Sequence, residues 1–473
     1  MNIKYYKWNK KEKNKLFKSC LEHLELKECQ FYQPYFSLYF HIHNTKNPPR
    51  IIDIHRRFYI KEIFNENIIE KYESSNLILS CSIEDKKNQC LQKKEVFSKC
   101  IPILDPLYFM MNNYNNNIHR NPLLPNNYSY NTSYKINDMH NSAYIDTFFS
   151  YLCSELTISD KNPSFPIFYG ALNGIKSHFK YDITDDYSNF KLEEWFHKGL
   201  GKTHTIDMYV SSDSDSGSDS GSDSDCDDND YISVIKDIPC QYLFIEKLEG
   251  TLEDFLDDEL NTHTIDIILS CIFQISFALS YLQKHYSFTH NDLHINNIMY
   301  VKTERLFLYY KFNNIYYKVP TYGYIFKIID FGRSIFTYHN KLFFNDSFDK
   351  HGEAEGQYTY PINKLLFNNK GGDKIIPNYN FDLCRLAITI LDASNYKETN
   401  KNNQYFFDFL KNLTMTKKGY YLSDMKDDFN MYVSISKDAC YALPKDVIQY
   451  SIFKSFRIKK KSFPKKIFYS LHL

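Results

Sequence analysis

The amino-acid sequence predicts an α+β fold, with strands concentrated before residue 246 and helices after it. Short apolar runs typical of buried strands recur up to that residue, and beyond it apolar positions repeat at helical spacing. Two polar motifs, at 288–299 and 326–334, each follow an apolar run, which places their polar side chains on loops at the rim of a core. A chain of 473 residues is long enough for about two or three domain-sized units.

Charge and cysteine usage exclude few classes of protein. Lys and Arg equal Asp and Glu at 57 each, so net charge argues neither for nor against a nucleic-acid partner, and we expect none. The 11 cysteines include no CxxC pair and no histidine pair at zinc-ligand spacing, which indicates reduced, buried thiols. The most apolar stretch, 265–282, contains Asp266 and Gln274 and is short for a membrane span. We therefore expect a buried helix there and no membrane partner.

The first half of the chain reads as a small sheet with one helix. Residues 1–60 are basic and then aromatic, and we interpret them as an N-terminal extension. Tyr144, Phe148 and Leu152 recur every four residues and predict a helix over 142–156. Four apolar runs are predicted as strands: 77–83, 96–103, 165–172 and 241–246.

The segment 211–230 consists almost entirely of Ser, Asp and Gly and has no basic or aromatic residue. Such a segment repels itself and has nothing to bury, so we expect a disordered surface insertion. A calcium-binding loop is the alternative, but the glycine and terminal glutamate of an EF-hand are missing.

The second half is predicted to be mainly helical. We expect a short helix at 251–260, a long one at 266–285, and a strand hairpin at 306–310 and 315–319. The last residues, 451–473, are strongly basic and are interpreted as a solvated face or tail, with nuclear targeting or a nucleic-acid patch as the alternative.

The two polar motifs contain the groups that phosphoryl transfer needs. One carboxylate must orient or deprotonate the attacking hydroxyl, and oxygen ligands must hold Mg²⁺ against the triphosphate. Asp292 and Asn297 lie five residues apart on one tight loop, and Asp330 ends the next strand. Gly332 is expected to let the chain turn sharply after Asp330.

The spacing His290-x-Asp292-Leu293-x-x-x-Asn297, followed by Asp330-Phe331-Gly332, resembles the catalytic loop and metal-binding segment of protein kinases. The resemblance implies a two-lobed fold, with an antiparallel-sheet N-lobe at 61–246, a mainly helical C-lobe at 247–450, and ATP in the cleft between them. It implies that Asp292 is the catalytic base and that Asn297 and Asp330 hold Mg²⁺. It also assigns His290 and Phe331 to the packed core behind the site.

Flanking segments extend the resemblance over about 75–400, most closely over 240–390. The run 241–256 resembles a kinase hinge, in which Ile245 is the gatekeeper and Glu246 to Leu248 meet the adenine. The run 380–391 resembles the central C-lobe helix, whose Asp382 caps the catalytic loop. In these details the chain also resembles uncharacterised kinase-like proteins of large DNA viruses.

The sequence departs from the kinase pattern at the phosphate-binding loop. No glycine precedes Gly170, so a glycine-rich loop in the usual form is excluded. The backbone amides that would cover the phosphates are expected in Ser74, Ser75 and Asn76.

The lysine that contacts the phosphates in kinases has its best candidate in Lys99, within the run Val-Phe-Ser-Lys. Its acidic partner is expected on the helix 142–156, which offers Asp146 and Glu155. Nine residues separate them, so they point to opposite faces and only one can serve. Glu155 is nearer the apolar stripe and has kinase-like spacing to the next strand, which favours it, whereas Asp146 is better centred.

Further departures concern control and substrate docking. Asn291 replaces the arginine that binds a phosphorylated activation loop, and His294 stands where a lysine reaches the transferred phosphate. The closing Ala-Pro-Glu is absent. Gly-Leu-Gly-Lys-Thr at 199–203 is not a P-loop, because residue 196, where the first glycine belongs, is Phe196.

The leading functional prediction is a divergent serine/threonine protein kinase that depends on Mg²⁺ and ATP and acts on a protein substrate. The alternatives are a catalytically weak pseudokinase scaffold and a small-molecule kinase of the choline or aminoglycoside type. The expected location is the cytoplasm, of a host cell if the protein is viral, with the nucleus as the alternative suggested by the basic C-terminal residues.

Overall fold

The computed structural model describes most of the 473 residues. The described ranges are 2–31, 51–70, 74–114, 124–125, 134–210, 229–256, 261–350, 352–358, 375–394, 403–426, 429–466 and 468–473. The predicted insertion at 211–230 lies outside them, except that its last two residues begin a strand.

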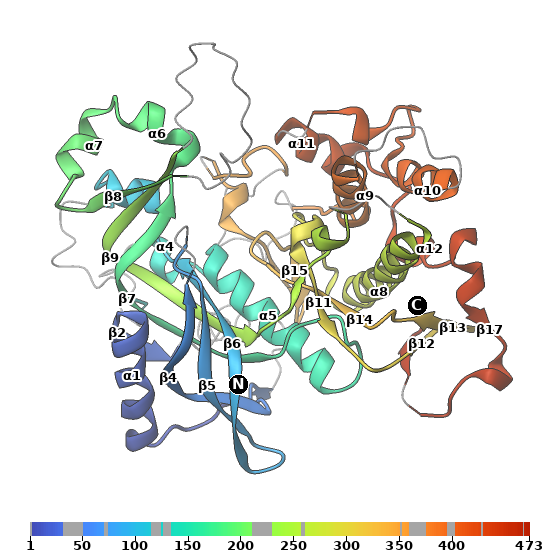
Figure 1. The fold of residues 1–473 in the computed structure, drawn as a ribbon, viewed down its shortest axis with the longest axis horizontal. Helices are drawn as coiled ribbons and strands as arrows, with labels where there is room; N and C mark the ends of the chain where they lie inside the picture. The colour runs from blue at the N-terminus through green and yellow to red at the C-terminus, as the bar shows by residue number, and fades with distance from the viewer. Residues whose placement is uncertain are drawn as a thin grey trace.

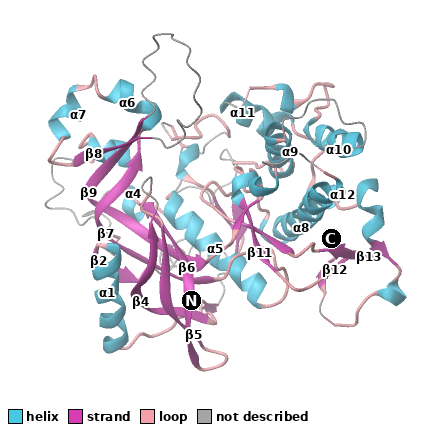
Figure 2. Ribbon diagram, viewed as in Figure 1, coloured by secondary structure: helices cyan, strands magenta, loops and turns pink. Residues whose placement is uncertain are grey.

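A seven-stranded antiparallel sheet occupies the first half of the chain (Figures 1 and 2). The strand order is β2-β7-β9-β6-β5-β4, and β8 pairs with β9. The strands are β2 (Leu26–Phe31), β4 (Phe58–Glu70), β5 (Leu77–Asp85), β6 (Cys90–Pro102), β7 (Phe168–Asp182), β8 (His204–Val210) and β9 (Asn229–Glu246). The four predicted strands are confirmed as β5, β6, β7 and β9, each longer than predicted at one end, although β7 begins three residues later and β6 ends one residue earlier than predicted.

Helix α5 (Ser142–Ile158) packs on the sheet and confirms the predicted helix. Asn141 caps its N-terminus by accepting a hydrogen bond from the amide of Ala143. Shorter helices on this side are α3 (Pro106–Met110), α4 (Tyr134–Asn137), α6 (Thr184–Phe190) and α7 (Glu194–Gly199).

The interpretation of residues 1–60 as an extension is wrong for their described part. Helix α1 (Lys10–Leu24) packs against β4, and β2 pairs with β7 as an edge strand of the sheet. The helix starts with a capping box between Asn9 and Glu12, and it buries Leu16, Cys20 and Leu24 in the sheet's core. β1 (Asn2–Lys4), which precedes α1, pairs with β3 (Ile51–Asp53), which follows β2 in the sequence.

The second half is mainly helical and is built around α8 (Thr262–Tyr286), which confirms the predicted long helix (Figure 2). By length and composition α8 could cross a membrane, but 94% of its most apolar window is buried inside the protein. Around it lie α9 (Phe381–Ala393), α10 (Gln404–Thr414), α11 (Phe429–Asp438) and α12 (Pro444–Val447). One apolar core joins α5, α8 and α9, and thus connects the sheet to the helices.

Small sheets fill the space between these helices. β10 (Gly250–Thr251), β11 (Ile298–Lys302) and β14 (Tyr324–Ile328) form one, and β15 (Phe336–Tyr338) pairs with β16 (Lys341–Phe343). The predicted helix at 251–260 is wrong in its described part: β10 is followed by a single 3₁₀ turn, η2 (Glu253–Phe255).

The predicted hairpin is confirmed as β12 (Phe307–Phe312) and β13 (Ile315–Pro320). The basic C-terminal residues are not a free tail, because β17 (Arg457–Ile458) pairs with β13 and β18 (Tyr469–Leu471) pairs with β12. Buried aromatic residues explain the difference. Phe453 and Tyr469 anchor this segment in the core, whereas its lysines stay exposed.

Candidate active site

The loop that follows α8 is fixed by hydrogen bonds from its backbone. Ser287 ends the helix in a left-handed conformation, and Asn291 also has a left-handed φ of 65°. The amides of His290 and Asn291 donate to the carboxylate of Asp382 on α9, at 3.0–3.1 Å. Asp382 therefore lies where the resemblance implied, beneath the loop, and holds the turn that presents Asp292.

Asp292 lies at the surface of this loop with 24% of its side chain exposed. Its Oδ1 accepts a hydrogen bond from the hydroxyl of Tyr432 at 3.0 Å, and Arg333 approaches the same oxygen at 3.7 Å. Tyr432 in turn accepts from Nε of Arg385 at 3.2 Å. A hollow of about 410 Å³ opens beside these groups and also contacts His294.

Asn297 closes the loop from the 3₁₀ turn η3 (Ile295–Asn297). Its Nδ2 donates to the carbonyl oxygen of Asp292 at 2.8 Å and to Nε2 of His294 at 3.0 Å. Burial lowers the pKa of His294, which fits a neutral ring that accepts this bond. Because both contacts use the amide nitrogen, the amide oxygen of Asn297 remains available as a ligand.

The segment 329–332 follows β14 and runs past the same loop. His290 Nε2 donates to the carbonyl oxygen of Ile329 at 2.9 Å, which ties the two motifs together. Asp330 has a left-handed φ of 61°, so the strained residue of the turn is Asp330 and not Gly332. Phe331 is buried, and its ring packs against Phe149 of α5 and against His290.

Lys99 on β6 connects α5 to this segment. Its Nζ lies 2.7 Å from Oδ2 of Asp146 and 2.8 Å from Oδ1 of Asp330. Asp146 also accepts the backbone amide of Phe331 on its other oxygen, at 3.0 Å. Three elements distant in sequence therefore converge on one lysine.

The charges in this cluster stabilise one another. Burial alone would lower the pKa of Lys99, but the carboxylates of Asp146 and Asp330 outweigh burial and raise it. Burial would likewise raise the pKa of Asp330, yet Lys99 lowers it to about 2. Lys99 is therefore cationic and Asp330 anionic at neutral pH.

The preference for Glu155 as the partner of Lys99 is wrong, and the alternative, Asp146, is the residue in contact. Glu155 lies two and a half turns further along α5, beyond the reach of Lys99, with Oε1 buried and without a hydrogen-bond partner among the described residues. Burial raises the pKa of Glu155 to about 7, although Arg56 counteracts the rise.

The hinge residues point in different directions. Ile245 lines a pocket of about 160 Å³ together with Lys99, Asp146 and Asp330. The carboxylate of Glu246 faces away from that pocket lining and accepts from Lys327 at 2.9 Å and from the amide of Ile167 at 3.1 Å. Leu248 is buried and is likewise not part of the lining.

The loop between β4 and β5 carries Ser74, Ser75 and Asn76 near Lys99. Asn76 lines the pocket, and its Oδ1 accepts the amide of Cys100, the neighbour of Lys99, at 2.9 Å. Ser75 instead accepts the amide of Lys180 on β7. Of the three residues, only Asn76 thus contributes to the pocket. The rejected P-loop at 199–203 is a turn that leads into β8, a strand.

Sequence reasoning missed two tyrosines that form hydrogen bonds with Asp292 and its neighbour Asn291. Tyr432 lies 140 positions after Asp292, on α11, and no motif marks it. Tyr358 was also missed, although its hydroxyl donates to the side-chain oxygen of Asn291 at 2.7 Å. The exchange of arginine for asparagine at position 291 was the one available signal.

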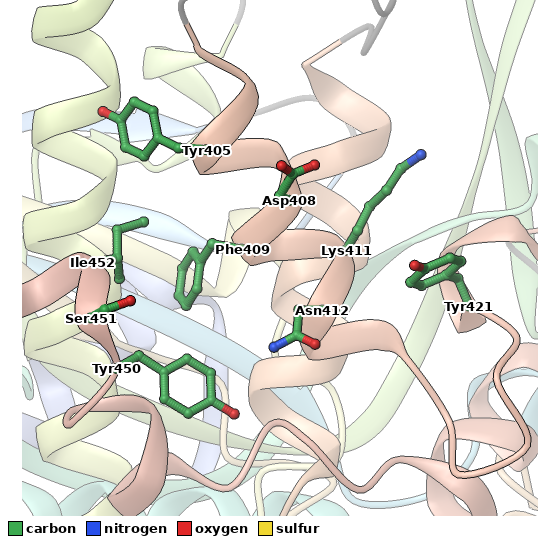
Figure 3. Close-up of a pocket in the computed structure, with 9 residues that line it drawn as sticks. All are labelled: Tyr405, Asp408, Phe409, Lys411, Asn412, Tyr421, Tyr450, Ser451 and Ile452. Atoms are coloured by element: carbon green, nitrogen blue, oxygen red, sulfur yellow. The ribbon is translucent and has the colours of Figure 1, made fainter.

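Other features of the surface do not add to this site. A hollow of about 760 Å³ contains none of the predicted site residues (Figure 3). It is lined by Tyr405, Asp408, Phe409, Lys411, Asn412, Tyr421, Tyr450, Ser451 and Ile452. Within the described ranges, no group of three His, Cys, Asp or Glu side chains could hold a metal ion by itself.

Comparisons with known proteins give short, partial matches. The chain is 30% identical over 152 residues to the serine/threonine-protein kinase haspin homolog of Drosophila melanogaster, which covers 30% of this chain and 27% of that protein. It is 30% identical over 132 residues to a probable serine/threonine-protein kinase of Dictyostelium discoideum, covering 26% of this chain and 11% of that protein. It is 46% identical over 72 residues to the uncharacterised protein 098R of Invertebrate iridescent virus 6, covering 14% and 12%.

No family model matches the chain. The chain spans less than a third of the length of each of these relatives, so their activities and substrates do not transfer with the similarity. The matched stretches are nevertheless similar to a serine/threonine-protein kinase homolog of one organism and to a probable serine/threonine-protein kinase of another. At this coarse level, the chain is kinase-like in sequence.

Proposed function

We propose that this chain is a divergent serine/threonine protein kinase that transfers the γ-phosphate of ATP, with Mg²⁺, to a hydroxyl of a protein substrate. The observation that carries the proposal is the contact of Lys99 with both Asp146 and Asp330, next to the loop that presents Asp292. In kinases, a strand lysine paired with a helix acid and a metal-binding aspartate forms the nucleotide half of the site. The proposal includes the two-lobed arrangement, with the sheet and α5 as the N-lobe and the helices as the C-lobe.

The residues present fit Mg²⁺ and ATP. Mg²⁺ prefers oxygen ligands and commonly uses one or two from the protein together with phosphate oxygens. The carboxylate of Asp330, 41% exposed, and the free amide oxygen of Asn297 meet that requirement. Mg²⁺, when bound, would neutralise charge on the phosphates, and Lys99 would contribute a second positive charge.

Asp292 is proposed to orient the acceptor hydroxyl and accept its proton. One of its oxygens is held by Tyr432, which fixes the carboxylate, and the hollow of about 410 Å³ gives a side chain access to it. His294, neutral and bonded to Asn297, is proposed to position the amide of Asn297. The backbone of Glu246 to Leu248 is proposed to meet the adenine, since the side chain of Glu246 is engaged by Lys327.

A pseudokinase is the second candidate, and the size of the pocket favours it. The pocket at Lys99 holds about 160 Å³, whereas ligand sites in proteins usually hold about 300–1,000 Å³. Binding of ATP in a kinase therefore requires that the loop at Asn76 and the hinge at Ile245 move apart. If that movement does not occur, Lys99, Asp146 and Asp330 would stabilise the fold of a scaffold protein and would not bind nucleotide.

The test is a transfer assay with radiolabelled γ-phosphate against the protein itself, a generic basic protein and a panel of small alcohols. Asp292→Asn should lower turnover by about 10²–10⁴-fold without loss of stability, and Asp330→Ala should abolish Mg²⁺-dependent nucleotide binding. Asp408→Asn, which changes a carboxylate of α10, is the matched control. Full activity of Asp292→Asn would overturn the assignment. ATP binding without any transfer would favour the pseudokinase.

A further inference from the structure

The sheet formed by β12, β13, β17 and β18 carries an unbalanced positive charge. Residues 305–320 contain three lysines and arginines and residues 451–473 contain seven, and neither range contains an aspartate or glutamate. The chain as a whole has 57 basic and 57 acidic residues. Charge of one sign is therefore gathered on one structural unit of a protein that is neutral overall.

Strand pairing brings these two ranges together, and the described residues of the connection between β17 and β18, 459–466 and 468, cross the outer face of the sheet. β17 and β18 are the two edge strands, so this connection joins opposite edges (Figure 1). On the inner face, Tyr317 packs against Phe273 of α8, with ring centroids 4.9 Å apart. Tyr316, which points to the opposite face, packs against Phe463 of the connection at 4.9 Å.

The cations on this face have no acidic partner among the described residues. Five exposed lysines of the connection form no ion pair there: Lys459, Lys460, Lys461, Lys465 and Lys466. Lys311 and Lys318 project from the strands and lie over the rings of Tyr316 and Phe307, at 6.0 and 3.8 Å. Positive charge thus covers both the sheet and the connection that crosses it.

A hollow of about 460 Å³ lies on the same unit. Its lining combines the cations Arg305 and Lys466 with the rings of Phe307 and Tyr309. The face is therefore indented between positive groups instead of being a uniformly convex, solvated surface.

We infer that this face binds nucleic acid through the phosphate backbone. Several lysines on one face displace the counterions of a polyanion together, which gives affinity without base recognition. An anionic membrane is disfavoured because the ring of Phe463 packs onto the sheet, where it cannot enter lipid. The inference reverses the expectation of no nucleic-acid partner, and it does not depend on the proposed phosphotransferase function.

The experiment measures binding of the full chain to a fluorescently labelled duplex DNA of about 25 base pairs, by anisotropy at several salt concentrations. With about five phosphate contacts, the logarithm of the association constant should fall with the logarithm of salt with a slope near −4.5. Lys460→Gln together with Lys461→Gln should weaken binding at about 50 mM salt by roughly tenfold or more and reduce the slope by about 2. Lys417→Gln together with Lys418→Gln, an exposed lysine pair elsewhere, is the control and should change neither quantity.

Each outcome decides the inference. Loss confined to the Lys460 and Lys461 variant, with an unchanged melting temperature, supports it. Absence of binding at about 50 mM salt, or equal loss in both double variants, overturns it, since non-specific nucleic-acid binding is strongest at low salt. Binding to phosphatidylserine vesicles but not to duplex DNA would also overturn it and would identify a membrane surface.

Discussion

Replacing Asp146 with asparagine should weaken binding of Mg-ATP, because it removes one of the two carboxylates that hold Lys99. The substitution keeps the size of the side chain and the acceptor for the amide of Phe331, which lies 3.0 Å from Oδ1. What changes is the charge at Oδ2, 2.7 Å from the ammonium group. Lys99 is then left with Asp330 as its single anionic partner at 2.8 Å.

The magnitude follows from these distances. At an effective dielectric constant of about 20, unit charges at either distance attract by about 6 kcal/mol before desolvation is subtracted. Because the two distances are nearly equal, both acids hold the ammonium group of Lys99. Without the charge of Asp146, Lys99 is held by Asp330 alone, the proposed metal ligand. A misplaced lysine forfeits a charge-assisted hydrogen bond to phosphate of about 1.5–3 kcal/mol. The dissociation constant of Mg-ATP should therefore rise by roughly ten- to a hundredfold.

Isothermal titration with ATP in the presence of Mg²⁺ measures this change without a substrate. Glu155→Gln is the matched control, because it neutralises the other acid of α5, which the sequence favoured as the partner of Lys99. It should leave the affinity for Mg-ATP unchanged. Both variants should be compared at pH 8, above the value of about 7 to which burial raises the pKa of Glu155.

Two results would refute the reasoning. An unchanged affinity in Asp146→Asn would mean that Lys99 does not contribute to nucleotide binding through this contact. An equal loss in Glu155→Gln would mean that α5 shifts in the nucleotide complex and brings its other face to the lysine.

Three further predictions concern neighbouring groups. Tyr432→Phe removes the donor to Asp292 and should lower kcat of phosphate transfer by about tenfold while KM for ATP stays constant, because the hydroxyl bonds to a charged group on the acceptor side. Tyr358→Phe leaves the buried side-chain oxygen of Asn291 without its donor and should lower the free energy of unfolding by about 1–3 kcal/mol, measured in urea, with ATP affinity unchanged. Burial raises the pKa of Glu155 from 4.5 to about 7, so the folded state loses stability as pH rises from about 4.5 to 7. Glu155→Gln should raise stability at pH 8 by up to about 3 kcal/mol and leave it unchanged at pH 4; a stabilisation that is equal at both pH values would contradict this cause.

Apolar periodicity was a reliable guide where an element buries one whole side. Helix α8 is apolar on nearly every face, and β5 begins with an apolar run and is buried at most of its positions, so both were predicted within a few residues. The C-terminal segment was not predicted in this way because its buried aromatic residues, such as Phe453 and Tyr469, are separated by lysines. Its apolar positions therefore show no regular spacing. Its place in the fold depends on β12 and β13, about 150 residues earlier in the chain.

In the candidate site too, some residues could be identified from local sequence patterns and others could not. Asp292, Asn297 and Asp330 lie on short loops and form motifs of fixed spacing. The sequence was therefore sufficient to identify them as candidates. The choice between Asp146 and Glu155 could not be made that way, because it depends on how α5 is rotated relative to β6. The apolar stripe suggested one rotation, whereas the contact of Phe331 with Asp146 and Phe149 reflects another.

Asn291 joins the loop of Asp292 to the segment after Asp330 through neutral hydrogen bonds. Asn291 donates through Nδ2 to the carbonyl oxygen of Arg333 at 3.0 Å and accepts from Tyr358 at 2.7 Å. An arginine at position 291 would be a buried cation that requires an anion such as phosphate, whereas asparagine satisfies its groups with neutral partners. The guanidinium of Arg333 is thereby left to face Asp292 and Glu353. The contacts of Asn291 therefore join the loop of Asp292 to the segment after Asp330 without a phosphate group.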